Sequence, residues 1–152
     1  MITPRDIKKA IIGELKAAFQ YPCYEFGVVE QMKYPCFFVR VTENAGIVTK
    51  NIYQHQYEAE IVMMHGGKER GDESRVLSDI EKIRELFLCK MKVGERIVPI
   101  ENYEMTYTGE RGNVPRITFD SPFYDSLYKK EDADMMEHVH IEEVVDNGNA
   151  KH

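Results

Sequence analysis

The sequence predicts an α+β domain, with a single antiparallel or mixed sheet of four to six strands, two helices on one of its faces and a C-terminal extension. Two segments repeat apolar residues at helical spacing, while the segments before and after the second of them alternate apolar and polar residues. Strands grouped on either side of a helix favour α+β over a doubly wound sheet. A chain of 152 residues is one domain long. We therefore expect a domain over 1–128 and an acidic extension over 129–152.

The first helix begins near the N-terminus. Thr3 suits the N-cap, Pro4 the first helical position and Asp6 the third position of a capping box. Behind them the apolar stripe consists of Ile7, Ile11, Leu15 and Ala18, widened by Ile12 and Phe19. Tyr21-Pro22 should end the helix. We expect its stripe to pack against Phe37, Val39 and Ile61.

Alternation predicts the strands that follow. Residues 23–30 form a short candidate strand, and 35–42 form a clear one with Phe37, Val39 and Val41 on one face. The segment 43–50 contains Asn44 and Gly46 and is predicted to be a loop. A long strand is expected over 51–64, and a glycine-rich turn over 65–71. On the long strand the apolar face carries Tyr53, Tyr57, Ala59, Ile61 and Met63, and the polar face carries Gln54, Gln56, Glu58 and Glu60.

A second helix is predicted over 72–90. Its buried stripe should contain Val76, Leu77, Ile80, Ile83, Leu86 and Phe87, and its outward face Ser74, Asp79, Glu81 and Arg84. The last third alternates again, which predicts strands over 96–100, 102–108 and 114–123 and a hairpin turn over 109–113.

Composition excludes several classes of protein. The net charge of −6, without a segment rich in Lys and Arg, argues against specific nucleic-acid binding. No apolar run approaches the roughly 18 residues of a membrane span, and the N-terminus lacks the layout of a secretion signal, so we expect a cytoplasmic protein without membrane partners. The three cysteines, an odd count at wide spacing, are expected to be buried free thiols.

No catalytic residue, cofactor site or metal site is expected. His55 and His65 are interpreted as structural or surface histidines, since they lie too far apart along a strand to share a metal. His138 and His140 would share one side of a strand and could bind zinc or nickel, but no third ligand is fixed. The glycines that follow His65 lack the spacing of a phosphate loop. No spacing singles out a nucleophile with its base.

The C-terminal extension is predicted to contact a neighbouring subunit or partner protein. It contains an apolar run that could add a strand to a neighbour's sheet edge, made up of Val139, Ile141, Val144 and Val145. In the domain, Lys50 and Arg111 are expected to pair with carboxylates of a neighbour. These six residues form the predicted interface.

Several strings in the order of the predicted elements resemble a known family. The first helix is followed by Tyr34-Pro35-Cys36-Phe37-Phe38-Val39, then by the polar strand that starts Tyr53-Gln54-His55-Gln56-Tyr57, the second helix and the closing β segment. Together, over about residues 3–125, they resemble the tail terminator proteins of long-tailed bacteriophages and of phage-derived particles. The extension lies outside the resemblance.

The resemblance implies an assembly role. Terminators form a six-fold ring on the end of the tail tube, which stops polymerisation of tube and sheath and offers a docking surface to the head connector. It implies homo-oligomerisation, tube, sheath and connector proteins as partners, a place at the head-proximal end of the virion tail, and assembly in the bacterial cytoplasm. Two alternatives stay open: another phage adaptor, such as a head-completion or tube-adaptor protein, and a small enzyme or regulatory binding module.

DNA would pass through such a ring, so its bore should not be basic. Candidates for the bore lining are the 43–50 segment, the polar face of residues 54–60 and the turn over 109–113.

Overall fold

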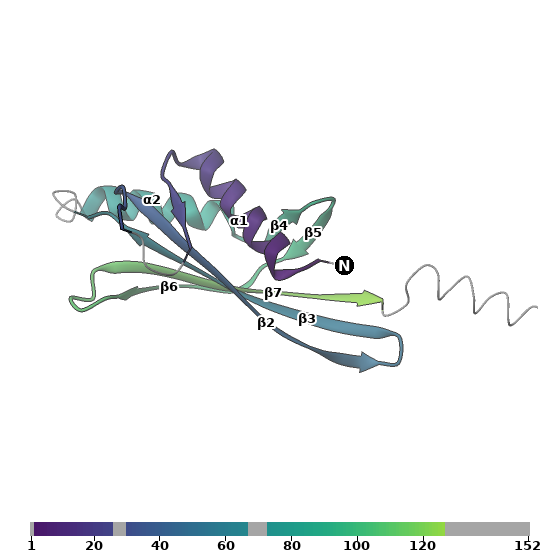
Figure 1. Cartoon of the computed structure of the whole chain (residues 1–152). Helices are drawn as coiled ribbons and strands as arrows, with labels where there is room; N and C mark the ends of the chain where they lie inside the picture. Colours follow the sequence, from purple (N-terminus) through teal and green to yellow (C-terminus); the bar gives the residue numbers. More distant parts are fainter. Residues whose placement is uncertain (1, 26–29, 67–72, 127–152) are drawn as a thin grey trace, which may run out of the picture.

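The computed structural model describes residues 2–25, 30–66 and 73–126, which form two layers. Figure 1 shows a twisted sheet on one side and both helices on the other. The sheet has five strands in the order β1-β2-β3-β7-β6, and a separate two-stranded sheet pairs β4 with β5. The predicted α+β class, with two helices on one face of a mixed sheet, is confirmed.

Helix α1, Pro4–Ala18, begins at the predicted cap. The Thr3 hydroxyl accepts a hydrogen bond from the Asp6 backbone N–H at 3.3 Å, and the Thr3 backbone N–H donates to Asp6 Oδ2 at 2.9 Å. This reciprocal pair satisfies amides that the first helical turn leaves without partners. These hydrogen bonds to the charged form hold the pKa of Asp6 below its usual 3.8.

Replacing Asp6 with asparagine should lower the stability of the domain at neutral pH. Because the folded-state pKa is depressed, the carboxylate stabilises the fold above the unfolded-state pKa, and this contribution is lost as the pH falls through the folded-state value. Urea unfolding of both proteins at pH 7 and at about pH 3 checks this. The difference between them should shrink at the lower pH, and a constant difference would contradict a role for the charge.

The large sheet is built around one long antiparallel hairpin. Strands β2, Cys36–Thr49, and β3, Ile52–Met64, pair along most of their length. Strand β7, Val114–Ser126, lies antiparallel to β3, and β6, Glu101–Thr108, borders β7. On the other side, β1, Cys23–Tyr24, pairs in parallel with Phe37 and Phe38 of β2. Phe26 and Val28 of the predicted first strand lie outside the described residues.

The prediction of a loop over 43–50 is wrong, because β2 continues to Thr49. Asn44 and Gly46 are poor strand formers, but they lie opposite Gln56 and Gln54 of β3. The ladder hydrogen bonds of the hairpin outweigh the local preference of these residues. The turn is therefore confined to Lys50 and Asn51, with one irregularity between Ile47 and Thr49.

Helix α2, Glu73–Leu86, ends earlier than the predicted limit at residue 90. The chain then enters β4, Lys90–Val93, which pairs with β5, Arg96–Pro99. Met91 and Val93 alternate as buried residues with exposed lysines, so this short segment follows the period of a strand. The second sheet was not predicted.

Two positions of α2 are reversed relative to the prediction. Leu77, assigned to the buried stripe, is 41% exposed, whereas Asp79, assigned to the outer face, is 9% exposed. Asp79 is buried because it forms hydrogen bonds with Tyr21 and His65, which lie on other elements. Ile80, Ile83 and Phe87 are buried as predicted.

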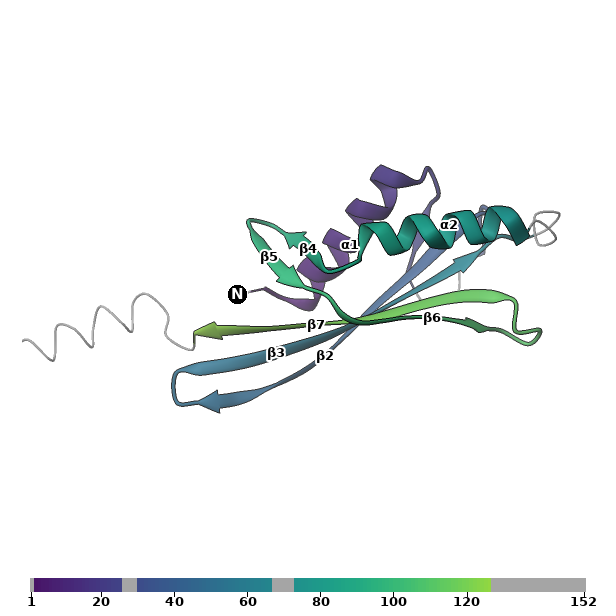
Figure 2. The ribbon, with the colours of Figure 1, turned by 180° about the vertical axis from the view of Figure 1, so that it is seen from behind.

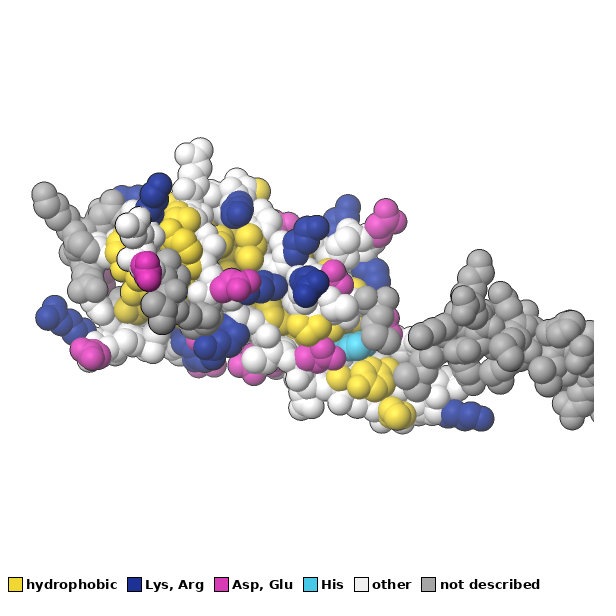
Figure 3. Space-filling view, viewed as in Figure 1, with side chains coloured by type: hydrophobic (Ala, Val, Ile, Leu, Met, Phe, Trp, Pro, Cys, Tyr) yellow, Lys and Arg dark blue, Asp and Glu magenta, His cyan; other side chains and the backbone are white. Residues whose placement is uncertain are grey.

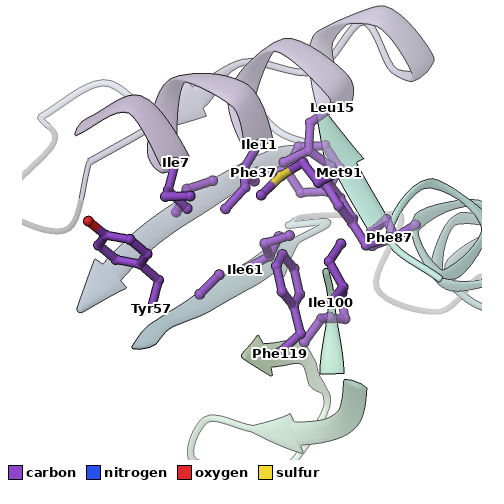
Figure 4. Packing of buried hydrophobic residues seen from close by; sticks show 14 of the residues in the cluster. Ile7, Ile11, Leu15, Phe37, Tyr57, Ile61, Phe87, Met91, Ile100 and Phe119 are labelled. Atoms are coloured by element: carbon purple, nitrogen blue, oxygen red, sulfur yellow. The ribbon is translucent and has the colours of Figure 1, made fainter. Parts of the chain in front are cut away.

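The core lies between the helices and the covered face of the sheet, as Figure 4 shows. Ile7, Ile11 and Leu15 of α1 are fully buried together with Phe37 and Ile61, which confirms the predicted helix–sheet packing. Val39 belongs to the same cluster. A smaller cluster of Cys36, Phe38 and Val62 lies apart from it.

Within the described ranges, neither helix has the length and apolar character needed to span a bilayer.

Candidate interaction surfaces

The β2–β3 hairpin extends past the helix layer, as Figures 1 and 2 show. Three aliphatic side chains near its end face solvent: Ile47 is 70% exposed, Val48 52% and Ile52 41%. Tyr124 of β7, opposite Gln54 of β3, is 58% exposed. In Figure 3 apolar side chains gather at this end of the molecule. Ile47 lies opposite Tyr53 and Tyr124 lies opposite Gln54, so exposed apolar side chains occur on both faces of the hairpin end, which is a candidate interaction surface.

A buried histidine holds the base of the hairpin. His55 is 2% exposed, and its ring stacks against Phe123 at 5.0 Å between centroids. Its Nδ1 lies 3.3 Å from Glu43 Oε1 of β2, and its Nε2 lies 3.1 Å from Asp125 Oδ2 of β7, although the latter pair is not aligned as a hydrogen bond. Arg96 of β5 also contacts the Asp125 carboxylate. Charged side chains of three other strands thus converge on one strand of the hairpin.

The two-carboxylate arrangement constrains the imidazole. Nδ1 faces Glu43 and Nε2 faces Asp125, so both ring nitrogens of His55 lie against carboxylates inside the domain. The interpretation of His55 as a structural histidine agrees with this environment. Its partners were not predicted, because Glu43 was assigned to a loop.

Both helices of the described residues lie on one face of the sheet, and neither covers the opposite face. The polar residues of β3 lie on it, and cross-strand pairing places Glu58 opposite Asp120 of β7, which in turn lies opposite Glu101 of β6. This acidic row, Glu58–Asp120–Glu101, brings like charges directly opposite one another, which is destabilising in a sheet. Asn102 Nδ2 donates to Asp120 at 2.9 Å, and in the neighbouring row Arg116 binds Glu60 at 3.0 Å.

Two of the six predicted interface residues, Lys50 and Arg111, lie in the described part of the chain, at opposite ends of the sheet. Lys50 is exposed in the β2–β3 turn, and Arg111 is exposed in the β6–β7 turn at the opposite end of the sheet. Val139, Ile141, Val144 and Val145 lie outside the described residues, as do His138 and His140. The exposed aliphatic residues of the hairpin end were not predicted to form a surface. The segment that contains Ile47 and Val48 was assigned to a loop, and a loop has no regular faces.

A polar network that the sequence did not reveal joins α2 to the end of β3. Asp79 Oδ2 accepts a hydrogen bond from the Tyr21 hydroxyl at 3.1 Å and lies 3.2 Å from His65 Nε2. Arg75 donates to the Tyr21 hydroxyl at 3.2 Å. Burial is the main cause that raises the pKa of Tyr21. The network satisfies its buried polar groups and so fixes how α2 sits on the sheet.

Metal-ligating and nucleophilic side chains of the described residues are considered next. Across the described ranges no three His, Cys, Asp or Glu residues gather as metal ligands. Cys36 is buried and Cys23 half-buried, and burial raises the pKa of both thiols. Cys89 is exposed, so the expectation that it is buried is wrong. The hollows on the surface are open, and the one beside α1 and β4, lined by Ile2, Lys9 and Val93, measures about 470 Å³.

Comparison with known proteins identifies the family. A family model described as "Phage tail terminator protein" matches residues 6–135. One solved chain is similar to this one at 16% identity, with a TM-score of 0.38, covering 85% of this chain and 99% of its own length. No curated protein matches the sequence. Because the family model spans most of the chain, this protein belongs to the phage tail terminator family and is a structural protein of the phage tail.

Proposed function

We propose that the chain assembles into a hexameric ring that caps the head-proximal end of the tail tube. The ring stops polymerisation of tube and sheath and offers its outer surface to the head connector. The match of the terminator family model to residues 6–135 carries this proposal. The structure supports it with a two-layer domain whose hairpin end and open sheet face suit contacts with other proteins. Assembly takes place in the cytoplasm of the bacterial host.

The experiment is a measurement of assembly state. Native mass spectrometry of the full chain should give a species of six times 17.7 kDa, and electron micrographs should show rings. Adding the ring to polymerising tail tube protein should shorten the tubes and label one end of each. A stable monomer or dimer that leaves tube length unchanged would contradict the proposal.

The open face of the sheet supplies the proposed bore lining. Of the three candidates from the sequence, the polar face of residues 54–60 has the strongest support, because Glu58 belongs to the acidic row with Asp120 and Glu101. Carboxylates repel the phosphates of DNA and do not retain it, so the genome can slide past. The acidic row lowers the stability of the monomer, and in the proposed ring it keeps DNA from binding to the bore.

The bore proposal predicts weak contact with DNA. The assembled wild-type protein should not retard duplex DNA at physiological salt, whereas Glu58→Lys combined with Asp120→Lys should produce salt-sensitive retardation. The matched control is Glu81→Lys with Glu85→Lys on the exposed side of α2, which should produce less retardation. Tight, salt-sensitive binding by the wild-type ring would contradict an acidic bore.

The extension over 129–152 supplies a contact between subunits. Truncation before Glu131 should leave the domain folded, because every residue of the described core precedes that position. The truncated protein should show weaker assembly in native mass spectrometry. An unfolded truncation product would instead make the extension a part of the core.

A further inference from the structure

The layer that contains α1 and the β4–β5 hairpin is basic, although the chain as a whole is acidic. These elements together carry seven Lys and Arg residues and three Asp and Glu residues, whereas the net charge of the chain is −6. Figure 3 shows Lys and Arg side chains over the helix layer on the viewed face. A layer with this excess of positive charge favours an acidic partner.

A hollow of about 470 Å³ lies in this layer, between α1 and β4. Lys9 and Lys92 line it, and Lys90 lies on the same exposed face of β4 as Lys92. All three lysines are exposed, and no ion pair joins them to a described residue. The carboxylate of Asp6, which also lines the hollow, already accepts hydrogen bonds from Thr3. The rest of the lining is apolar or lacks a side chain: Ile2, Ala10, Val93 and Gly94. The hollow therefore suits a segment with several carboxylates and a few apolar side chains.

A segment that follows β7 has this composition. Residues 131–137 read Glu-Asp-Ala-Asp-Met-Met-Glu, with four carboxylates, three apolar side chains and no Lys or Arg. Methionine adapts its shape to an irregular apolar surface. Lys129 and Lys130 precede the segment and belong to the linker. The family model matches the chain as far as residue 135, nine residues beyond the end of β7, so the region that the family shares includes the start of this segment.

The chain leaves the sheet close to the hollow. Asp125 of β7 contacts Arg96 of β5, and Arg96 lies opposite Val93, which lines the hollow. One arginine side chain and one cross-strand spacing of about 5 Å thus separate Asp125 from Val93. The five steps from Ser126 to Glu131 span up to about 17 Å in an extended chain. Residues 131–137 can therefore reach the hollow of their own domain.

We propose that residues 131–137 dock into the hollow between α1 and β4 of their own chain. Carboxylates of the segment pair with Lys9 and Lys92, and its two methionines contact the apolar part of the lining. A single exposed ion pair contributes little, so the docking depends on several pairs and on the short linker, which keeps the effective concentration of the segment high. The inference goes beyond the proposed ring, because it anchors the first part of the extension on the domain. The apolar run over 139–145 then starts at a fixed place, from which it can contact a neighbouring subunit.

Disulfide crosslinking within the full chain tests the docking. In a Cys89→Ser background, which lacks the exposed native thiol, Ala10→Cys places a thiol in the hollow and Ala133→Cys places one in the acidic segment. Oxidation of the dilute double variant should close a disulfide within single chains, which peptide mass spectrometry under non-reducing conditions detects. Ala133→Cys alone shows how much the segment pairs with the remaining native thiols.

The matched control replaces Ala10→Cys with Ala17→Cys, two helical turns away and more exposed. A segment that only samples the surface would favour the more accessible Ala17 position. Docking should instead give about fivefold less disulfide at Ala17 than at Ala10, because it raises the local concentration of the segment only at the hollow.

The role of charge is tested by reversing it. Lys9→Glu combined with Lys92→Glu should lower the yield of the disulfide between positions 10 and 133 several-fold, as should salt at about 0.5 M. Lys16→Glu combined with Lys33→Glu, at exposed positions outside the lining of the hollow, should lower it less. A yield that neither the Lys9 and Lys92 reversal nor salt changes would overturn ion pairing as the basis of the docking.

The outcomes separate this inference from the proposed function. The disulfide within single chains, in a protein that forms no ring in native mass spectrometry, would support the docking and contradict the hexamer. Rings without a preference for Ala10 over Ala17 would overturn the docking and leave the ring intact. Ala10→Cys and Ala133→Cys are also made in separate samples and mixed. Dimers from the mixture, with no disulfide within single chains of the double variant, would place the segment on a neighbouring copy and overturn docking on its own chain.

Discussion

Replacing Leu15 with alanine is expected to lower the free energy of unfolding by about 2–5 kcal/mol. Leu15 is fully buried in the cluster where α1 packs on the sheet, next to the layer formed by Phe37 and Met91. The substitution removes buried methyl groups and leaves a cavity that close-packed neighbours fill only in part. Urea unfolding at neutral pH, followed by circular dichroism, measures the loss.

The matched control for Leu15 is its neighbour in the sequence. Lys16→Ala alters an exposed position on the same helix, where alanine has a helix propensity at least as high, so its effect should stay within about 0.5 kcal/mol. If Leu15→Ala lowers the free energy of unfolding by less than about 0.5 kcal/mol, the packing of α1 on the sheet does not contribute to stability as expected.

Patterns of short range in the sequence predicted the elements correctly where local preference and tertiary structure agree. The capping residues and the apolar stripe of α1 lie within one segment and specify one helix, so both were recognised. The alternation along β3 and β7 likewise assigned their faces, because one side of each strand contacts the core. Membership of the terminator family, inferred from the order of these elements, was also correct.

The rest depends on pairing between distant segments. Glu43–Thr49 becomes a strand because β3 lies beside it, although Asn44 and Gly46 within it favour a turn. Asp79 is buried because Tyr21 and His65, distant in the sequence, provide hydrogen-bond partners. The acidic row requires the registers of β3, β7 and β6, which a single sequence does not specify. The polar face was thus predictable, but the charge arrangement on it was not.

Replacing His55 with phenylalanine is expected to destabilise the domain by about 1–3 kcal/mol. Phenylalanine keeps a ring of similar shape between Tyr57 and Phe123, so the stacking contacts survive. What disappears is the pair of ring nitrogens that face Glu43 and Asp125, and both carboxylates remain next to an apolar ring. A mostly buried carboxylate that loses its polar partner stays desolvated without compensation. The loss is limited because Arg96 still contacts Asp125.

The control for His55 distinguishes the loss of its polar contacts from a general weakening of the hairpin. Tyr53→Phe, two residues away on the same face of β3, removes only a hydroxyl from a half-buried ring and should change the stability little. If the contacts of His55 with the two carboxylates hold the hairpin against β7, the His55→Phe protein should also exchange the backbone amides of β2 near Ala45 faster than the wild type, with smaller changes in α1. Unfolding free energies that are equal for the wild type and His55→Phe would show that β-sheet pairing alone positions the hairpin end.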